Sequence, residues 1–303
     1  MTDENEPRPP GGRARFRPGK RLLPFPYNQD LSGVLRHLDR SRPESRVRLA
    51  NDPFTAAYLA AGMRLLERNL GPGAQRGPHG KPYLVSFLSQ RGVADEVANN
   101  PRPFPRRGTP RSLRHAWRSQ SDFVADLINF AVWEENYRPK YRRQRAANTK
   151  KLVKGPDFVR AIHEMAYEHT AEGVEMPSVR LALALMTSAD GDMEVKRAIS
   201  RMYEDYLGSW KMLYEDVLRQ RGLRLRPGLT LDDLANALSA ATDGMILRAV
   251  GDPGADVLDH ERRRSLFGSV ALAIVHAFLE PEGDESGLTL EEAVAARFDN
   301  GPY

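Results

Sequence analysis

The sequence of 303 residues contains no cysteine. This absence excludes disulfides, zinc–thiolate sites, iron–sulfur clusters and thiol nucleophiles, and it fits a reducing compartment. Long hydrophobic runs are also missing, because no apolar stretch reaches the roughly 18–20 residues that a membrane-spanning helix needs. Residues 1–20 contain charge and proline but no apolar signal-peptide segment. From these absences we expect a cytoplasmic protein without a membrane partner.

Motifs of the common enzyme classes are absent as well. There is no phosphate-binding loop, no dinucleotide fingerprint and no nucleophile elbow. Asp190, Asp192 and Glu194 could hint at magnesium, but acidic residues in this position more commonly cap a helix and favour its dipole. His163 and His169 are six residues apart, not the four that place two metal ligands on one helical face. We therefore expect no enzymatic activity and no metal or cofactor.

Charge is abundant but unevenly distributed. Residues 1–154 contain 30 lysines and arginines against 14 acidic residues, a net charge of +16. Residues 155–303 carry a net charge of −11, so the total of +5 conceals two halves of opposite sign. The basic half is the expected footprint of a polyanionic partner, whereas phosphate would repel the acidic half. The asymmetry predicts a separate role for each half.

Proline separates the same two halves, because fifteen of the 22 prolines lie in residues 1–110. We expect residues 1–51, rich in proline and arginine, to form a flexible basic N-terminal extension; a solvated tail without a role is the alternative. Beyond Asp52 apolar residues recur at helical spacing, and no strand pattern competes. The predicted fold is all-α, with a DNA-binding domain over residues 52–136, a helical domain over 137–280, and a C-terminal tail with a short helix over 281–303.

Residues 107–128, RGTPRSLRHAWRSQSDFVADLI, predict a short capped helix followed by a longer one. Thr109 is a suitable N-cap and Pro110 a suitable first helical residue. Leu113 and Trp117 are spaced to hold the short helix to its supports. Polar and basic side chains on its other face could enter a major groove and reach phosphates or guanine edges, although a solvated basic face would look the same. The candidate DNA-binding residues are Arg106, Arg107, Thr109, Arg111, Ser112, Arg114, His115 and Gln120.

This stretch resembles the end of the helix-turn-helix of the TetR (tetracycline-repressor) family, whose pattern is roughly G-V-S-x-G-x-L-Y-x-H-F-x-S-K-x-x-L-L. Leu113 falls on the leucine of that pattern, Trp117 on its aromatic position and Ser119 on its serine. Phe123 and Val124 fall on the apolar pair that opens the following long helix. The resemblance implies that the short helix is a recognition helix and that the partner is double-stranded DNA.

The C-terminal half is similar to the same family. Residues 229–250 and 262–281 resemble its last two helices, so that the resemblance covers roughly residues 54–280. It implies a homodimer with a four-helix interface, although a monomeric core would use the same residues. Candidate interface residues are Leu234, Leu238, Phe267, Val270, Ile274 and Phe278. The family also implies a pocket for a small-molecule effector, here of unknown class, although stripes of aromatic residues and methionine are more often core. Candidate pocket residues are Met165, Met186, Met202, Tyr206, Trp210 and Met245.

Three features depart from the family pattern, and the first is the extension of residues 1–51 that precedes the first helix. Residues 87–101, FLSQRGVADEVANNP, stand where a compact second helix is expected, and the Pro/Arg-rich residues 101–110 follow in place of a tight turn. Gln120 replaces the usual lysine, which weakens one phosphate contact.

A second basic cluster over residues 137–151 could contact flanking phosphates or be a solvated linker.

Together these patterns favour a dimeric regulator of transcription, most simply a repressor, with or without an effector. The alternative is a helical assembly or nucleic-acid-scaffolding protein whose degenerate helix-turn-helix has no operator specificity.

Overall fold

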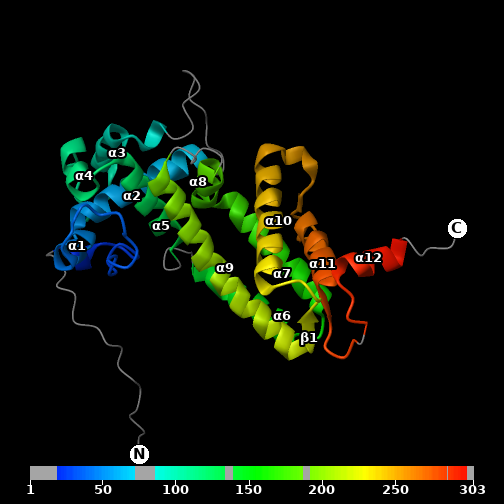
Figure 1. Ribbon diagram of the computed structural model, residues 1–303. Coiled ribbons are helices and arrows are strands. Elements are labelled where there is room, and N and C mark those ends of the chain that lie inside the picture. The colour runs from blue at the N-terminus through cyan, green and yellow to red at the C-terminus, as the bar shows by residue number, and fades with distance from the viewer. Residues whose placement is uncertain (1–18, 72–85, 134–138, 187–191, 285, 299–303) are drawn as a thin grey trace, which may run out of the picture. The chain divides into compact units, whose positions relative to one another are not determined.

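A computed structural model describes residues 19–71, 86–133, 139–186, 192–284 and 286–298 (Figure 1). Over these residues the protein has twelve α-helices and four short strands, so it is mostly helical, as the sequence predicted. The strands form two small antiparallel pairs, which the sequence did not predict. None of the described helices is long and apolar enough to cross a membrane.

The chain divides into two compact units. Unit 1 comprises residues 1–69 and 75–136, and unit 2 comprises residues 70–74 and 137–303. The helices of unit 1 are α1 (Pro43–Ala50), α2 (Pro53–Leu70), α3 (Gln90–Glu96), α4 (Pro110–Ala116) and α5 (Gln120–Val132), with single 3-10 turns η1 at Lys20–Leu22, η2 at Ser86–Leu88 and η3 at Val97–Asn99.

Helices α2 and α5 approach closely in the core of unit 1. At Gly62 of α2, a Cβ atom would lie 2.9 Å from a methyl carbon of Leu127 and 3.0 Å from the ring of Phe123. Both α5 residues are almost fully buried. A glycine at this point therefore lets the two helices pack at short range.

The structure corrects the expected N-terminal extension, because residues 19–51 fold onto unit 1. Leu31 and Leu35 have no exposed surface. The backbone N–H of Asp39 donates to the carbonyl oxygen of Ala116, at the end of α4. The expectation failed because these apolar residues are spread through turns and have neither helical nor strand spacing. Residues 1–18 lie outside the described residues.

Unit 2 is built mainly from helices that pack on α7. In Figure 1, α9 runs along the unit and α10 and α11 lie beside α7. The helices are α6 (Pro139–Lys154), α7 (Phe158–Glu175), α8 (Pro177–Met186), α9 (Met193–Arg221), α10 (Leu231–Gly251), α11 (Leu266–Phe278) and α12 (Leu290–Phe298), with a 3-10 turn η6 at Pro253–Ala255. The strands are β1 (Leu223–Leu225), β2 (Leu258–Asp259), β3 (Arg264–Ser265) and β4 (Leu279–Pro281).

The β1–β4 pair joins the end of α9 to the end of α11. Gly222 ends α9 with a φ of +59°, which is a left-handed C-cap. In β4, the buried carboxylate of Glu280 pairs with Arg224 at 2.8 Å and with Arg226 at 3.0 Å. These two ion pairs hold β4 to β1 and to Arg226, the residue that follows β1.

Candidate nucleic-acid interface

The N-terminus of α4 is fixed by a capping box. The Thr109 hydroxyl oxygen accepts from the backbone N–H of Ser112 at 3.1 Å, and the Ser112 hydroxyl oxygen accepts from the backbone N–H of Thr109 at 3.1 Å. Pro110 occupies the first turn. Tyr58 of α2 bonds to the same group, because its hydroxyl donates to the Thr109 carbonyl oxygen at 3.1 Å and contacts the Ser112 hydroxyl. The start of α4 is therefore anchored on α2.

One face of α4 is buried by Leu113, Ala116 and Trp117, as the sequence predicted. The Trp117 ring has no exposed surface and packs edge-on against Phe123, with ring centroids 5.0 Å apart. Its indole N–H donates to a carboxylate oxygen of Asp126 at 2.8 Å. This buried face holds α4 against α5.

Asp126 is the polar centre of unit 1. Besides the Trp117 bond, its fully buried carboxylate accepts from the backbone N–H groups of Arg36, at 2.7 Å, and His37, at 3.1 Å. Burial raises the pKa of Asp126, and the bond from Trp117, the charge of His37 and these two amides oppose the rise. One side chain of α5 thus joins the end of α4 to the segment that precedes α1.

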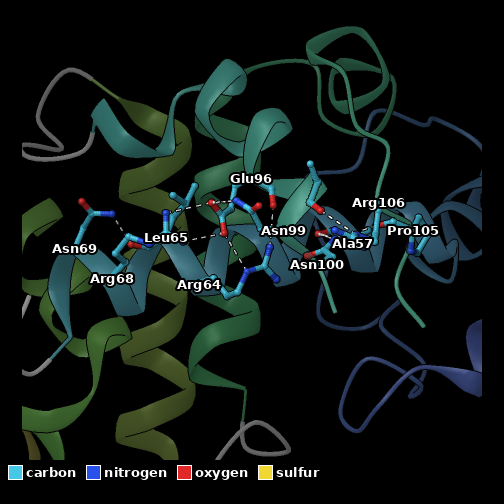
Figure 2. A network of polar contacts seen from close by, with 11 residues as sticks. Ala57, Arg64, Leu65, Arg68, Asn69, Glu96, Asn99, Asn100, Pro105 and Arg106 are labelled. Atoms are coloured by element: carbon cyan, nitrogen blue, oxygen red, sulfur yellow. Dashed lines mark hydrogen bonds and ion pairs between the residues drawn. The ribbon is translucent and has the colours of Figure 1, made fainter. Parts of the chain in front are cut away.

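Glu96, at the end of α3, ties that helix to α2, as Figure 2 shows. Its buried carboxylate pairs with Arg64 and Arg68 of α2, each at 3.0 Å, and accepts from the Asn99 side chain at 3.1 Å. Burial raises the pKa of Glu96, but the hydrogen bonds from Arg68, Asn99 and Arg64 outweigh it, so the pKa lies below its usual value. Glu96 therefore stays ionised and holds α3 in place.

The connector between α3 and α4 is held at two places (Figure 2). The Asn100 amide donates to the carbonyl oxygens of Ala57 and Pro105, both at 3.1 Å. At Gly108, a Cβ atom would lie 2.9 Å from Cβ of Val97 and 3.1 Å from the carbonyl oxygen of Ala94. Although longer than a tight turn, the connector packs closely on α3 and η3 and brings α4 against α3.

All eight candidate DNA-binding residues have exposed side chains. Thr109 and Ser112 also form the capping box described above. The Arg106 guanidinium donates to the carbonyl oxygen of Ala98 at 2.9 Å. Within the described part of the chain, Arg107 and Arg111 form no hydrogen bond or ion pair. The set thus contains residues that position α4, namely Thr109 and Ser112, and exposed basic residues such as Arg107 and Arg111. Arg114, His115 and Gln120 complete the set and are exposed as well.

The structure adds a basic residue that sequence reasoning missed. Arg40, before α1, places a guanidinium nitrogen 2.6 Å from Nε2 of His115. No local pattern in the sequence could have identified it, because the contact joins residues 75 positions apart.

The second basic cluster is only partly described. Lys151 of α6 pairs with Glu164 of α7 and Arg143 is exposed. The side chains of Arg138, Lys140, Arg142 and Arg145 lie outside the described residues.

Unit 2 contains an apolar cavity of about 90 Å³ between α7, α9, α10 and α11. Of the candidate pocket residues, Met165, Tyr206 and Trp210 line it. Met186, Met202 and Met245 are not among its lining residues. Met186 lies at the end of α8, which does not line the cavity, and Met245 packs against the core of unit 2. The lining is almost entirely apolar, and its main polar feature is a hydrogen bond of 2.7 Å between His169 Nε2 and the Tyr206 hydroxyl.

The candidate interface residues also divide. Leu234, Leu238 and Phe267 lie in the hydrophobic core of unit 2 itself, which corrects their assignment to a surface between protomers. Helical spacing identifies an apolar face but does not say which neighbour covers it. Val270, Ile274 and Phe278 are half-buried. The exposed faces of α10 and α11 instead carry small and apolar residues, namely Ala240, Gly244, Leu247, Leu266, Ser269 and Ala273.

Comparisons with protein-family models, with curated proteins and with solved structures found no match to this chain.

Proposed function

We propose that the protein is a homodimeric regulator of transcription of the TetR type, which binds double-stranded DNA through α4 and acts as a repressor. The observation that carries the proposal is the construction of α4. Its N-terminus is capped and anchored, one face is buried, and Arg111, Arg114 and His115 extend from the other. A helix that enters a major groove needs a rigid mounting and an exposed face of this chemistry.

The surroundings of α4 support the same function. Helix α3 packs against it, as the first helix of a helix-turn-helix does. Residues 1–154 carry the net charge of +16 that would attract a polyanion. The exposed small residues of α10 and α11 would allow the corresponding helices of a second copy to approach closely and form the dimer.

The apolar cavity of unit 2 is the proposed effector site. An uncharged, largely apolar molecule fits its lining, and the His169–Tyr206 pair offers one polar anchor. Binding there would regulate the repressor only if the effector prefers one of two conformations.

One observation favours the alternative, a nucleic-acid scaffold without operator specificity. The connector over residues 100–109 is longer than the turn of three or four residues typical of a helix-turn-helix. Such a protein would bind DNA through phosphate contacts alone and show no preferred sequence.

Selection from random genomic fragments, with sequencing of the bound DNA, tests the proposal. We expect enrichment of one palindromic site by the wild-type protein and its loss in the Arg111→Ala/Arg114→Ala variant. Arg197→Ala/Arg219→Ala, on exposed positions of α9, is the control with the same change in net charge and should retain the site. Equal, salt-sensitive retention of all fragments by all three proteins would favour the scaffold.

A further inference from the structure

The segment around α1 places basic side chains beside the C-terminal end of α4. The backbone N–H of Asp39 donates to the carbonyl oxygen of Ala116 at 2.9 Å, which fixes the segment to the last turn of α4. The Arg46 guanidinium donates to the carbonyl oxygen of Arg36 at 2.8 Å, and this bond ties α1 to the same segment. The segment and the end of α4 therefore form one built surface.

A hollow of about 220 Å³ lies in this surface. Its lining residues are Arg40, Ser45, Arg48, Leu49 and His115. No described acidic residue is among them, and Arg48 is exposed and forms no hydrogen bond or ion pair with any described residue. The hollow thus has two guanidinium groups, an imidazole and a hydroxyl, with no carboxylate to balance them.

Arg40 is fixed at the wall of the hollow by two contacts. Its guanidinium donates to the carbonyl oxygen of Asp39, and one of its nitrogens lies 2.6 Å from Nε2 and 3.2 Å from Nδ1 of the His115 ring. A guanidinium group keeps its positive charge in such contacts and can only donate hydrogen bonds. An anion in the hollow would therefore meet the permanent positive charges of Arg40 and Arg48 and no carboxylate among the lining residues.

We infer that this hollow binds a phosphate group, and that the group is a phosphodiester of the DNA that α4 binds. The forked guanidinium group of Arg48 can donate to two phosphate oxygens at once, Arg40 adds a second fixed positive charge, and Ser45 adds a hydroxyl donor. His115 belongs to α4, so a phosphate in the hollow would lie on the backbone beside the groove that α4 enters. The assignment of this phosphate to DNA rests on the proposed function. The binding of a phosphate group in the hollow is inferred from the lining residues alone.

The test uses the full-length protein with two probes, a fluorescent DNA duplex and inorganic phosphate. Arg48→Gln is the mildest variant, since removing the Arg48 guanidinium group leaves no described group without a partner. Arg40→Gln/Arg48→Gln removes both guanidinium groups. Arg197→Gln/Arg219→Gln is the control with a matched loss of charge. Thermal melting followed by circular dichroism verifies that each variant is folded.

DNA affinity is measured by fluorescence anisotropy over a range of salt concentrations. We expect Arg40→Gln/Arg48→Gln to weaken binding about tenfold. The slope of log affinity against log salt should fall by about 0.9, the amount for one phosphate contact. The control should change neither quantity, and Arg48→Lys should recover more of the slope than Arg48→Gln. Wild-type slopes in both hollow variants, together with unchanged phosphate binding, would overturn the inference.

Isothermal titration with inorganic phosphate separates the two sources of the group. If phosphate binding is lost in the hollow variants while DNA binding is unchanged, the hollow takes a free phosphate group and its assignment to DNA is overturned. If the wild-type protein does not bind DNA, the proposed function fails and the titration alone decides. If the wild-type protein then binds phosphate and the variants do not, the hollow is supported as a phosphate site. If the wild-type protein binds no phosphate, the inference is overturned.

Discussion

At the scale of single residues, Asp126 joins three parts of unit 1, namely α5, the end of α4 and the segment that precedes α1. Its carboxylate accepts from the Trp117 indole and from the amides of Arg36 and His37. Removing one partner of a buried network costs the full desolvation penalty of the groups left behind. One side chain therefore contributes both to the position of α4 and to the docking of the N-terminal segment.

Replacing Asp126 with alanine should lower the free energy of unfolding by about 3 kcal/mol, because the buried indole N–H of Trp117 and the part-buried amides of Arg36 and His37 lose their acceptor. Urea denaturation of the full-length protein measures the loss. Asp95→Ala, on the exposed surface of α3, should change stability by less than about 0.5 kcal/mol. Equal effects of the two substitutions would contradict the role given to Asp126.

Lys20 predicts a dependence of stability on pH. Its side chain is fully buried, and burial lowers its pKa to about 8 against the opposing charges of Asp30 and Asp52. The unfolded state retains the ordinary lysine pKa of about 10.4, so it binds more protons than the folded state between these values. The contribution of Lys20 to stability should therefore rise with pH across this window.

Lys20→Met should remove that rise. Free energies of unfolding measured at several pH values from about 7 to 10 should show a steeper increase in the wild-type protein than in the variant. Parallel curves for the two proteins would show that the Lys20 pKa does not differ between the folded and unfolded states.

At the scale of elements, the close approach of the connector to α3 and η3 depends on Gly108. A Cβ atom there would meet Cβ of Val97 and the backbone carbonyl oxygen of Ala94, neither of which is the end of a movable side chain. Gly108→Ala should therefore destabilise the protein by about 1–3 kcal/mol and weaken DNA binding. Gly33→Ala, where the added carbon meets open space, is the matched control. Equal thermal melting of the two variants would contradict this packing.

Local signals mark the ends of several elements. The predicted cap of α4 at Thr109 is confirmed. The capping box of Thr230 and Asp233 at α10 and the end of α9 at Gly222 are signals of the same kind. Each depends on residues within three or four positions of one another. The buried face of α4 was predictable for the same reason, because helical spacing places Leu113 and Trp117 on one side.

Contacts between distant parts of the chain were not predictable. The folding of residues 19–51 onto unit 1 depends on a bond between Arg36 and Asp126, 90 positions apart. The hollow beside α4 follows from that docking, so no motif could reveal it. Leu234 and Phe267 were assigned to the dimer interface on the family resemblance, and their helical spacing could not correct it, because spacing identifies a buried face without identifying the helix that covers it.

At the scale of the whole molecule, the two halves carry opposite charge. The basic residues 1–154 would attract phosphate, whereas the acidic residues 155–303 would be repelled by it and have a second role. We propose that this second role is dimerisation through the exposed faces of α10 and α11. Single small residues decide how closely two such faces approach, so the dimer should be sensitive to added volume and charge there.

Ala240→Glu/Ala273→Glu should convert the dimer into a monomer without loss of helix, because two carboxylates would enter the close-packed centre of the interface. Light scattering coupled to size-exclusion chromatography measures the mass, and circular dichroism measures the helix content. Val159→Glu, at an exposed position of α7, should leave the dimer intact. A wild-type protein that is monomeric at all concentrations would contradict the interface.

The docking of residues 19–51 onto Asp126 also has a consequence for synthesis on the ribosome. The segment emerges 90 residues before its partner. At translation rates of about 5–20 residues per second, this delay lasts about 5–20 s. Leu31 and Leu35 have no core to enter during that time, so the nascent segment is an accessible target for a chaperone. The first part of unit 1 to be made is among the last parts to fold.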